Sequence, residues 1–474
     1  MLNNLFTFLN QLNKEGQNIF LSISFLTLLS GTLVGISFMF LSDSIDNPAI
    51  LILTALAIPL AYLLVVKFSE VSFALFLLAG FYKGDPRLEF LPQFLDLTVL
   101  FGLLSVAGIF YALIKKGESL SFPPKNIFLT YGLLVFMGLI SLTYTSAPTY
   151  GTEKFLRFVT ITSLAFLSPF TLFKTAESIK RFFVIFILLA SSMLLDLFLQ
   201  GISPVDFYFR TAFGSDYLAL ARIQGIAFIF VFFYFLLSSK SLAVKLINLA
   251  LIFPLLFGIY ISGGRAPALA LSITLVVTMV LVFLASFGRQ HRASQALVKR
   301  DFKIIGSILI IIFLGISLLA YFSDYFSTFI HRTILLIERS EESSPERVDM
   351  YTQALRTFLS FPYFLSGTGI GGFTVSYAGF DDKRGIYPHN IFLEMASELG
   401  FLGLLAIFLL IFWSLKDGFS LFKRNQDSNS TYLSLTLLAL FIFLLLNSLV
   451  SGDINDNRIL FASMALIQVG KKIL

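Results

Sequence analysis

The chain has 474 residues, of which 57% are hydrophobic and 13% charged, and its formal net charge is +6. Soluble domains carry about 25% charged residues, so this composition excludes an ordinary water-soluble protein and indicates one that lies mostly in lipid. Cysteine is absent, which excludes disulfides, a thiolate nucleophile and a cysteine-ligated metal.

Apolar runs long enough to cross or nearly cross a bilayer recur along the whole chain, since about 20 residues suffice for a full span. The runs at 69–82 and 457–470 are short, which is typical of re-entrant or tilted segments, so the expected number of spans is twelve to fourteen. The sequence therefore predicts an all-α polytopic membrane protein. The fourteen runs lie at 18–41, 48–66, 69–82, 95–114, 126–146, 153–173, 182–200, 217–238, 246–262, 266–288, 303–322, 391–414, 431–451 and 457–470.

Lysine and arginine are distributed unevenly between the two sets of connecting loops. The loops "KKGESLSFPPK", "KTAESIKR", "RQHRASQALVKRDFK" and "KDGFSLFKR" are basic, whereas the alternate loops, such as "SGDINDN", are not. Basic loops remain in the cytoplasm, so both termini are expected there. The positive charge thus reflects topology, and a nucleic-acid partner is not expected because the basic residues do not form one face.

A long polar loop, residues 323–388, separates N-terminal membrane helices (1–322) from C-terminal ones (389–474) and is expected on the outer, extracytoplasmic side. It contains two helical stretches. The first is the amphipathic "STFIHRTILLIERS". The second begins at "SSPERVDMYTQALRTFL", with Ser344 as the expected N-cap and Pro345 at the first helical position. Its apolar residues at helical spacing predict one side packed on an apolar surface; they are Val348, Tyr351, Leu355 and Phe358.

The turn "SGTGIGGF" contains a literal G-x-G-x-x-G at Gly367, Gly369 and Gly372. A dinucleotide site is not expected, because no strand precedes the motif and no βαβ unit surrounds it. Glycines also permit a sharp backbone turn, and a tight turn beside the membrane surface is the favoured interpretation.

Four arginines lie on the side of the membrane that the positive-inside rule disfavours: Arg210, Arg265, Arg332 and Arg347. An ionisable group at membrane depth is expensive and usually functional, and the planar guanidinium suits phosphate oxygens. Together they would form an anion site suited to a lipid pyrophosphate. The alternative is a set of independent interfacial anchors, and Arg332 and Arg347 also have acidic neighbours with which they could pair.

His389 opens the helix in "YPHNIFLEMASELGFLG". The positive end of a helix dipole favours neutral imidazole, which can act as a general base for a sugar hydroxyl; the alternative is an interfacial capping residue. Glu394 and Glu398 are rotated from His389 by roughly 140° and 180° at about 100° per residue. They are therefore expected to bond neighbouring helices or to line a polar cavity, with a proton relay left open. His291 and His331 are isolated, and no metal site is expected.

These motifs resemble the O-antigen ligase and O-antigen polymerase superfamily of bacterial polysaccharide assembly. The resemblance rests on His389, Asn390, Gly400 and Gly403, on the Arg-x-x-x-Leu pattern of "RTILL", on "ISGGRAPALAL" and on "RVDMYTQALRTFLSFPYFLSGTGIGGF". One departure is the "SGG" before Arg265, where many members have Ser directly before the Arg. Residues 1–200 match only in hydropathy.

The resemblance implies a GT-C-like membrane glycosyltransferase of the bacterial inner membrane, with its active site on the periplasmic side. Its donor would be a glycan on undecaprenyl pyrophosphate and its acceptor the lipid A core, or another lipid-linked glycan in a polymerase. His389 would activate the acceptor hydroxyl, while Arg210 and Arg265, assisted by Arg332 and Arg347, would hold the pyrophosphate. Inversion of the anomeric centre without a metal or other cofactor is implied.

Two other classes of protein remain open. A solute transporter of the bicarbonate type would need polar groups along a path from both faces, and no internal repeat supports an inverted-repeat transporter. A structural scaffold for the assembly machinery would retain its function after His389→Ala.

Overall fold

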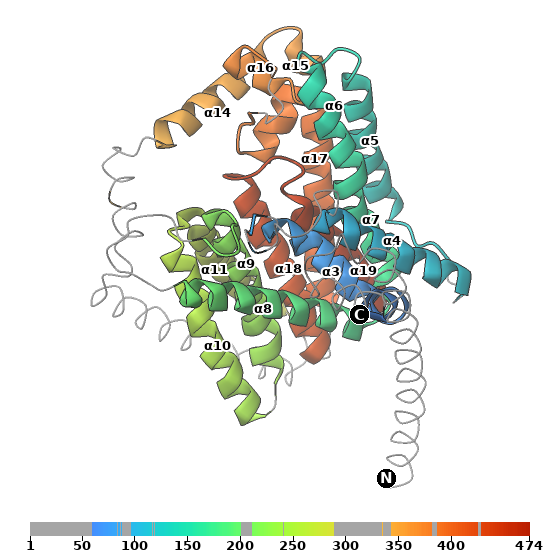
Figure 1. Cartoon of the computed structure of the whole chain (residues 1–474), viewed down its shortest axis with the longest axis vertical. Coiled ribbons are helices and arrows are strands. Elements are labelled where there is room, and N and C mark those ends of the chain that lie inside the picture. Colours follow the sequence, from blue (N-terminus) through green and yellow to red (C-terminus); the bar gives the residue numbers. More distant parts are fainter. Residues whose placement is uncertain are drawn as a thin grey trace, which may run out of the picture.

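The computed structural model describes residues 59–82, 84, 85, 87, 96–115, 117, 119–200, 211–239, 241–288, 334, 343–381, 386–424 and 428–474. These residues form helices joined by short turns, and no strand occurs among them. Figure 1 shows the helices gathered around α18 and α19, with α14, α15 and α16 together at one end. The elements are α3 (Ser69–Leu78), η2 (Ala79–Phe81), α4 (Leu97–Lys115), α5 (Lys125–Ser141), α6 (Pro148–Arg157), η4 (Phe158–Thr162), α7 (Ser163–Leu172), α8 (Ala176–Leu199), α9 (Tyr217–Ile229), η5 (Phe230–Leu236), α10 (Leu242–Ile261), α11 (Arg265–Gly288), α14 (Ser343–Leu359), α15 (Tyr363–Ser366), α16 (Phe373–Ala378), α17 (Ile391–Arg424), α18 (Ser428–Ser448) and α19 (Arg458–Ile473).

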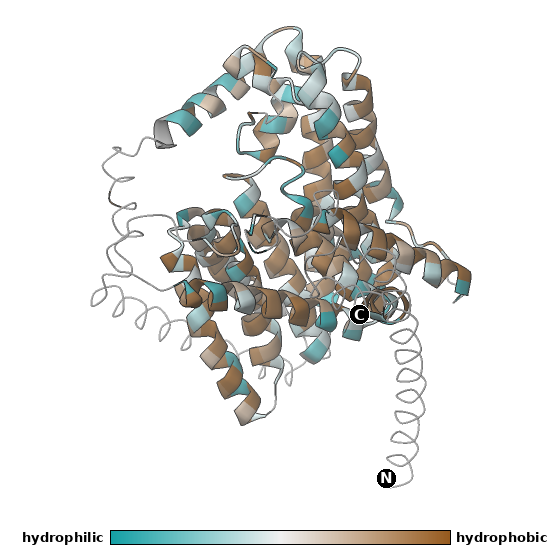
Figure 2. Ribbon diagram, in the orientation of Figure 1, coloured by the Kyte–Doolittle hydropathy of each residue, from teal (hydrophilic) through white to brown (hydrophobic). Residues whose placement is uncertain are grey.

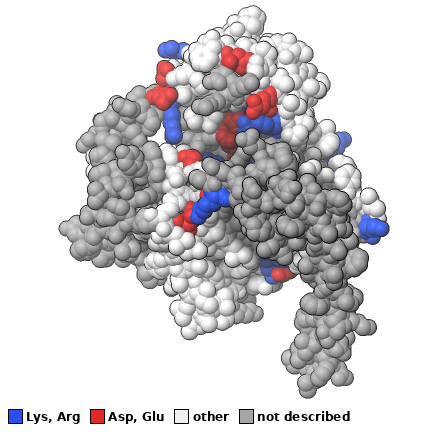
Figure 3. Space-filling model, in the orientation of Figure 1, with Lys and Arg blue, Asp and Glu red and all other residues white. Residues whose placement is uncertain are grey.

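Eight helices in the described part of the chain are long and apolar enough to cross a membrane, which confirms an all-α polytopic membrane protein. The predicted runs at 48–66 and 69–82 meet in one bent pair, in which the chain bends by 107° between Pro59–Val66 and Ser69–Phe81. Figure 2 shows that the helices are predominantly hydrophobic, while polar residues gather on α14 and in the connecting turns. Most of the described surface on this face carries no charged side chain (Figure 3). The predicted spans 18–41 and 303–322, the first loop helix and residues 1–58 lie outside the described residues.

Phenylalanine fills much of the core between the helices. The rings of Phe183 on α8 and Phe230 on η5 stack with centroids 4.0 Å apart, and both side chains are fully buried. Helix packing in lipid depends on close van der Waals contact rather than on exclusion of water, which these stacked rings provide. The interior is therefore rigid enough to hold side chains at the ends of the spans in fixed positions.

Helix α17 is broken at Gly400, whose φ of 66° and ψ of −160° are not helical. A short half-helix, 391–399, precedes the break and a long segment, 401–424, follows it. A Cβ on Gly400 would lie 2.4 Å from the carbonyl oxygen of Leu365, and one on Gly403 would lie 2.3 Å from the Cβ of Leu399. Both positions thus lack the space that a side chain would need.

The glycine-rich turn closes the end of this half-helix. The N–H groups of Thr368 and Gly369 donate to the carbonyls of Ser397 and Glu398, each at 2.9 Å. Carbonyls at a helix end otherwise lack partners. Gly367, Gly369 and Gly371 have positive φ, which the turn requires. The interpretation as a tight turn is therefore confirmed, and its role is to cap a broken helix.

Helix α14 begins at Ser343, one residue before the expected N-cap at Ser344. Its packed side consists of Met350, Ala354 and Thr357, and Met350 and Ala354 form a small core with Phe373 of α16. The predicted apolar side is only half right: Val348 and Leu355 are exposed. Alternative faces of one helix can both be apolar, and periodicity alone does not say which of them packs on the protein.

Candidate active site

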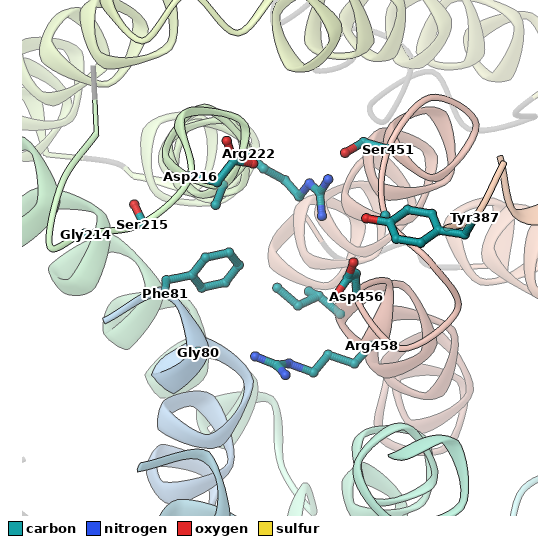
Figure 4. Close-up of a pocket in the computed structure, with 13 residues that line it drawn as sticks. Gly80, Phe81, Gly214, Ser215, Asp216, Arg222, Tyr387, Ser451, Asp456 and Arg458 are labelled. Atoms are coloured by element: carbon teal, nitrogen blue, oxygen red, sulfur yellow. The ribbon is translucent and has the colours of Figure 1, made fainter. Parts of the chain in front are cut away.

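A pocket of about 370 Å³ lies where the ends of several helices meet. Its walls come from η2, the turn before α9, α9 itself, the residues before α17 and the turn between α18 and α19 (Figure 4). Its lining is unusually polar for a chain of this composition. The lining residues are Gly80, Phe81, Gly214, Ser215, Asp216, Ala219, Arg222, Tyr387, Ser451, Gly452, Asp456, Arg458 and Ile459.

Two arginines enter the pocket from different helices. Arg222 of α9 and Arg458 of α19 both direct their guanidinium groups into the same space (Figure 4). The Arg458 Nε and Nη2 donate to the carbonyl of Leu77 at 3.2 and 3.1 Å. Arg222 is only 8% exposed, and its Nε has no hydrogen-bond partner in the described part of the chain. A buried, unsatisfied guanidinium donor is costly, which favours an anionic ligand beside it.

Asp456 stands between the two arginines in Figure 4. Its Oδ1 lies 3.8 Å from Arg157 Nη2, and 45% of its side chain is open to the pocket. The surrounding protein and the nearby Asp453 carboxylate raise the pKa of Asp456 above its usual range. Burial, reinforced by Asp456, likewise raises the pKa of the Tyr387 hydroxyl, so that hydroxyl remains a hydrogen-bond donor. The pocket thus offers donors to an anion from three sides.

His389 lies beside this pocket, two residues after Tyr387. Its ring centroid is 4.5 Å from that of Tyr387, and its φ is 53°, in the left-handed region. Left-handed backbone is uncommon outside glycine, although histidine tolerates it better than most residues. The direction of the His389 side chain therefore depends on this left-handed backbone conformation as well as on its rotamer.

Polar anchors on both sides hold the backbone of His389 in place. Before it, the Thr374 hydroxyl accepts from the Ile386 N–H at 2.9 Å and donates to the Ile386 carbonyl at 3.0 Å. After it, the Asn390 Oδ1 accepts from the N–H groups of Phe392 and Leu393, so Asn390 caps the helix. The Asn390 Nδ2 also donates to the Leu449 carbonyl at 3.0 Å. Anchors of this kind hold a strained conformation in place.

Burial lowers the pKa of His389 to about 4, with the positive charge of Arg347 acting in the same direction and Asp453 opposing it. The imidazole is therefore neutral near pH 7 and able to accept a proton. The sequence predicts a neutral imidazole from the helix dipole, and in the structure burial and Arg347 lower its pKa.

A buried ion-pair cluster supports the half-helix that follows His389. Lys154 of α6 lies 2.7 Å from Glu394 and 2.8 Å from Glu398, and all three side chains are inaccessible to solvent. Glu398 also accepts from the Gly371 N–H at 2.8 Å, and Glu394 from the Ile454 N–H at 3.2 Å. This confirms that the two glutamates bond a neighbouring helix. In the described residues, no group of three or more His, Asp or Glu side chains could hold a metal ion.

The structure describes two of the four arginines that were predicted to form an anion site. The positive charge of Arg347 on α14 contributes to the lowered pKa of His389. Arg265 is half-buried at the start of α11. The preceding Gly264 lies against Ala221, next to Arg222, and a Cβ there would be 2.6 Å from the Ala221 Cβ. This close approach explains the glycines of "SGG". Arg210 and Arg332 lie outside the described residues.

Sequence reasoning missed Arg222, Arg458 and Lys154. Arg222 and Lys154 lie within apolar spans, and an ionisable residue there is itself a signal of function or of a buried partner. The convergence of Arg222 and Arg458 depends on how helices distant in sequence are packed, so spacing could not reveal it. The same applies to Tyr387, whose role becomes visible only beside Asp456.

The geometry defines a class of protein: a polytopic helical membrane protein in which a pocket lined by two arginines lies beside a neutral histidine. Residues 249–408 match the family model described as O-antigen ligase, in agreement with the resemblance that the sequence motifs show. The match contains Arg265, Arg347 and His389, whereas Arg222 and Arg458 lie outside it. A search of curated proteins found no match. This match supports a role in glycan transfer during O-antigen assembly.

Proposed function

We propose that the protein transfers a glycan from undecaprenyl pyrophosphate to an acceptor hydroxyl at the outer leaflet of the inner membrane, as an O-antigen ligase acting on the lipid A core. The observation that carries this proposal is the neutral imidazole of His389 beside a pocket into which Arg222 and Arg458 both point. A base for a hydroxyl and a clamp for a diphosphate are the two functions that such a transfer needs.

In the proposed reaction, His389 takes the proton of the acceptor hydroxyl as its oxygen attacks the anomeric carbon. The bond to the diphosphate breaks with its electron pair on the leaving oxygen, and attack from the opposite face inverts the anomeric centre. Arg222 and Arg458 stabilise the charge that develops on the diphosphate. An arginine fork binds phosphate oxygens in a bidentate manner, so this step proceeds without a metal.

Two acidic and two basic side chains line the pocket. Asp216 and Asp456 oppose Arg222 and Arg458, so the four side chains carry no net charge when all are ionised. The raised pKa of Asp456 makes its protonation easier when phosphate approaches. Protonated Asp456 would donate to a phosphate oxygen instead of repelling it.

The remaining predicted arginines complete the proposal. Arg347 contributes positive charge beside His389, where it assists in holding the diphosphate. Arg265, Arg210 and Arg332 are proposed to lie on the same periplasmic side, which requires both termini to be cytoplasmic. The GT-C-like architecture is part of the same proposal.

Complementation of a strain lacking the gene tests the proposal, with lipopolysaccharide gels as the readout. His389→Asn and Arg222→Gln are expected to leave long glycan on its lipid carrier and a bare core, while Arg356→Gln, an exposed substitution on α14, restores wild-type ladders. A core carrying a single repeat in the strain without the gene would identify a polymerase instead. Normal ladders from His389→Asn at equal expression would refute the mechanism.

A further inference from the structure

Helix α14 carries an apolar stripe that does not pack on the described part of the protein. Val348, Leu355 and Leu359 are 60%, 48% and 65% exposed, and the stripe continues beyond the helix to Phe361 at 87% and Leu365 at 60%. A contiguous exposed apolar surface of this kind marks an interaction site. Nothing in the proposed reaction uses it.

The geometry of the helix separates three faces. At about 100° per residue, Val348, Leu355 and Leu359 fall within about 40° of one another, whereas the packed residues Met350 and Thr357 lie about 180° away. The charged Asp349 and Arg356 lie between the two faces and are exposed. A helix with one face on protein, one apolar face and a charged flank is typical of a helix lying in a membrane interface.

The stripe is continuous with helices that are expected to face lipid. The Phe364 ring of α15 lies 5.1 Å from the Phe358 ring of α14 and 5.7 Å from the Phe401 ring, which begins the long segment of α17. On the other side, the Tyr144 hydroxyl donates to the Ser366 carbonyl at 2.7 Å. Tyr144 follows α5, whose Phe136 and Leu139 are also exposed. An apolar surface therefore connects the sides of α5 and α17 to α14.

We infer that the stripe of α14 is a lipid-binding surface, so that α14 lies in the plane of the outer leaflet with Val348, Leu355 and Leu359 among the upper parts of the acyl chains. The occupant is bilayer lipid. Continuity with the lipid-facing sides of α5 and α17 favours it over a partner protein, which would not need to share that surface. The charged flank would face the headgroups and water.

This placement of α14 would set the depth in the membrane at which His389 and the neighbouring pocket lie. Arg347 of α14 acts on His389, and the Tyr351 hydroxyl reaches the Leu449 carbonyl at 3.4 Å, so α14 is tied to the histidine loop and to the end of α18. A helix held at the level of the headgroups would hold these groups at the level where the diphosphate of a lipid-linked substrate lies.

Site-specific fluorescence tests the inference directly, because the chain has no cysteine of its own. The full-length protein with Leu355→Cys or Leu359→Cys is labelled with an environment-sensitive dye in nanodiscs of phosphatidylethanolamine and phosphatidylglycerol. Glu346→Cys is the matched control, on the same helix about 160° from the stripe, and Phe136→Cys is the control for lipid exposure. Quenching by a tracer lipid with a nitroxide near the head of its acyl chain is compared with quenching by iodide in water.

Lipid nitroxide is expected to quench the dyes at 355 and 359 about threefold more strongly than the dye at 346, with iodide showing the opposite order. Quenching by iodide alone would overturn the inference, because the stripe would face water. Protection from both quenchers would also overturn it, because protein would then cover the stripe. The readout does not depend on glycan transfer, so its failure is distinct from failure of the proposed function.

Discussion

The Nζ of Lys154 lies 2.7 Å from the Oε1 of Glu394, at a place that solvent does not reach. Removing one partner of a buried pair typically costs about 3–5 kcal/mol, because the other charge remains uncompensated. We therefore expect Lys154→Met to destabilise the protein by about that amount, since two carboxylates would remain without a counter-ion. Thermal unfolding in detergent measures the effect.

The matched control for Lys154→Met combines it with Glu394→Gln and Glu398→Gln, which removes all three charges while keeping their shapes. This triple variant is expected to recover most of the lost stability. If Lys154→Met unfolds at the wild-type temperature, the cluster does not carry the charges assigned to it.

His389→Asn separates the chemistry of His389 from its backbone conformation. Asparagine adopts the left-handed region more readily than other non-glycine residues, so the positive φ of 53° should persist and stability should stay close to wild type. Loss of a general base typically lowers the rate about 10²–10⁴-fold, and kcat for glycan transfer is expected to fall by that amount. An unchanged kcat in folded protein would remove His389 from the mechanism.

The dependence of transfer on pH follows from the pKa of His389, which is about 4 in the free protein. The base is neutral above that value, so kcat/KM should decline only as the pH falls through about 4. Because this pKa lies below the unfolded value of about 6.5, the unfolded chain binds more protons, and the contribution of His389 to stability should decrease between pH 6.5 and 4.

Arg347→Gln tests the cause of this low pKa. Removing the positive charge of Arg347 should raise the pKa of His389. The fall of kcat/KM at acidic pH, which we call the acidic limb of the pH profile, should then begin at a higher pH. Glu346→Gln, a change at the neighbouring exposed position, should leave the limb where it is. A limb that does not move in Arg347→Gln would mean that the two residues do not interact.

Arg222→Gln and Arg458→Gln are each expected to weaken transfer about 10–100-fold, because charged hydrogen bonds to a diphosphate are worth about 1.5–3 kcal/mol. Arg222→Lys should recover only part of the loss, since lysine lacks the planar fork. Steady-state kinetics with a purified lipid-linked donor measures both variants. Wild-type kinetics in both glutamine variants would mean that the pocket does not bind the donor.

Gly400→Ala is expected to disrupt the join between the two parts of α17. The added Cβ would lie 2.4 Å from the Leu365 carbonyl oxygen, and the φ of 66° disfavours any side chain. A strained conformation of this kind costs about 1–3 kcal/mol, so the unfolding temperature should fall. Gly132→Ala, where a Cβ has open space, is the control.

Hydropathy alone predicted most spans in the described residues, because each must be apolar whatever its neighbours are. The capping role of Asn390, the break at Gly400 and the turn at Gly367–Gly372 were also predictable, since each depends on local backbone chemistry. Arg222, Arg458 and the partner of Glu394 were not predicted, because helices far apart in sequence bring them together. For α14 the prediction was wrong for Val348 and Leu355, which are exposed. The helix has two apolar faces with the same period, so periodicity did not show which of them packs on the protein.

The break at Gly400 uncouples the rotation of the two parts of α17 about the helix axis. A continuous helix would transmit every insertion or deletion along its axis, at about 100° of rotation per residue. Here the segment 401–424 could change length or lipid-facing residues to suit a different bilayer without turning His389, because the half-helix before Gly400 is fixed by its own contacts. The membrane segment and the reactive end of one helix can therefore diverge independently.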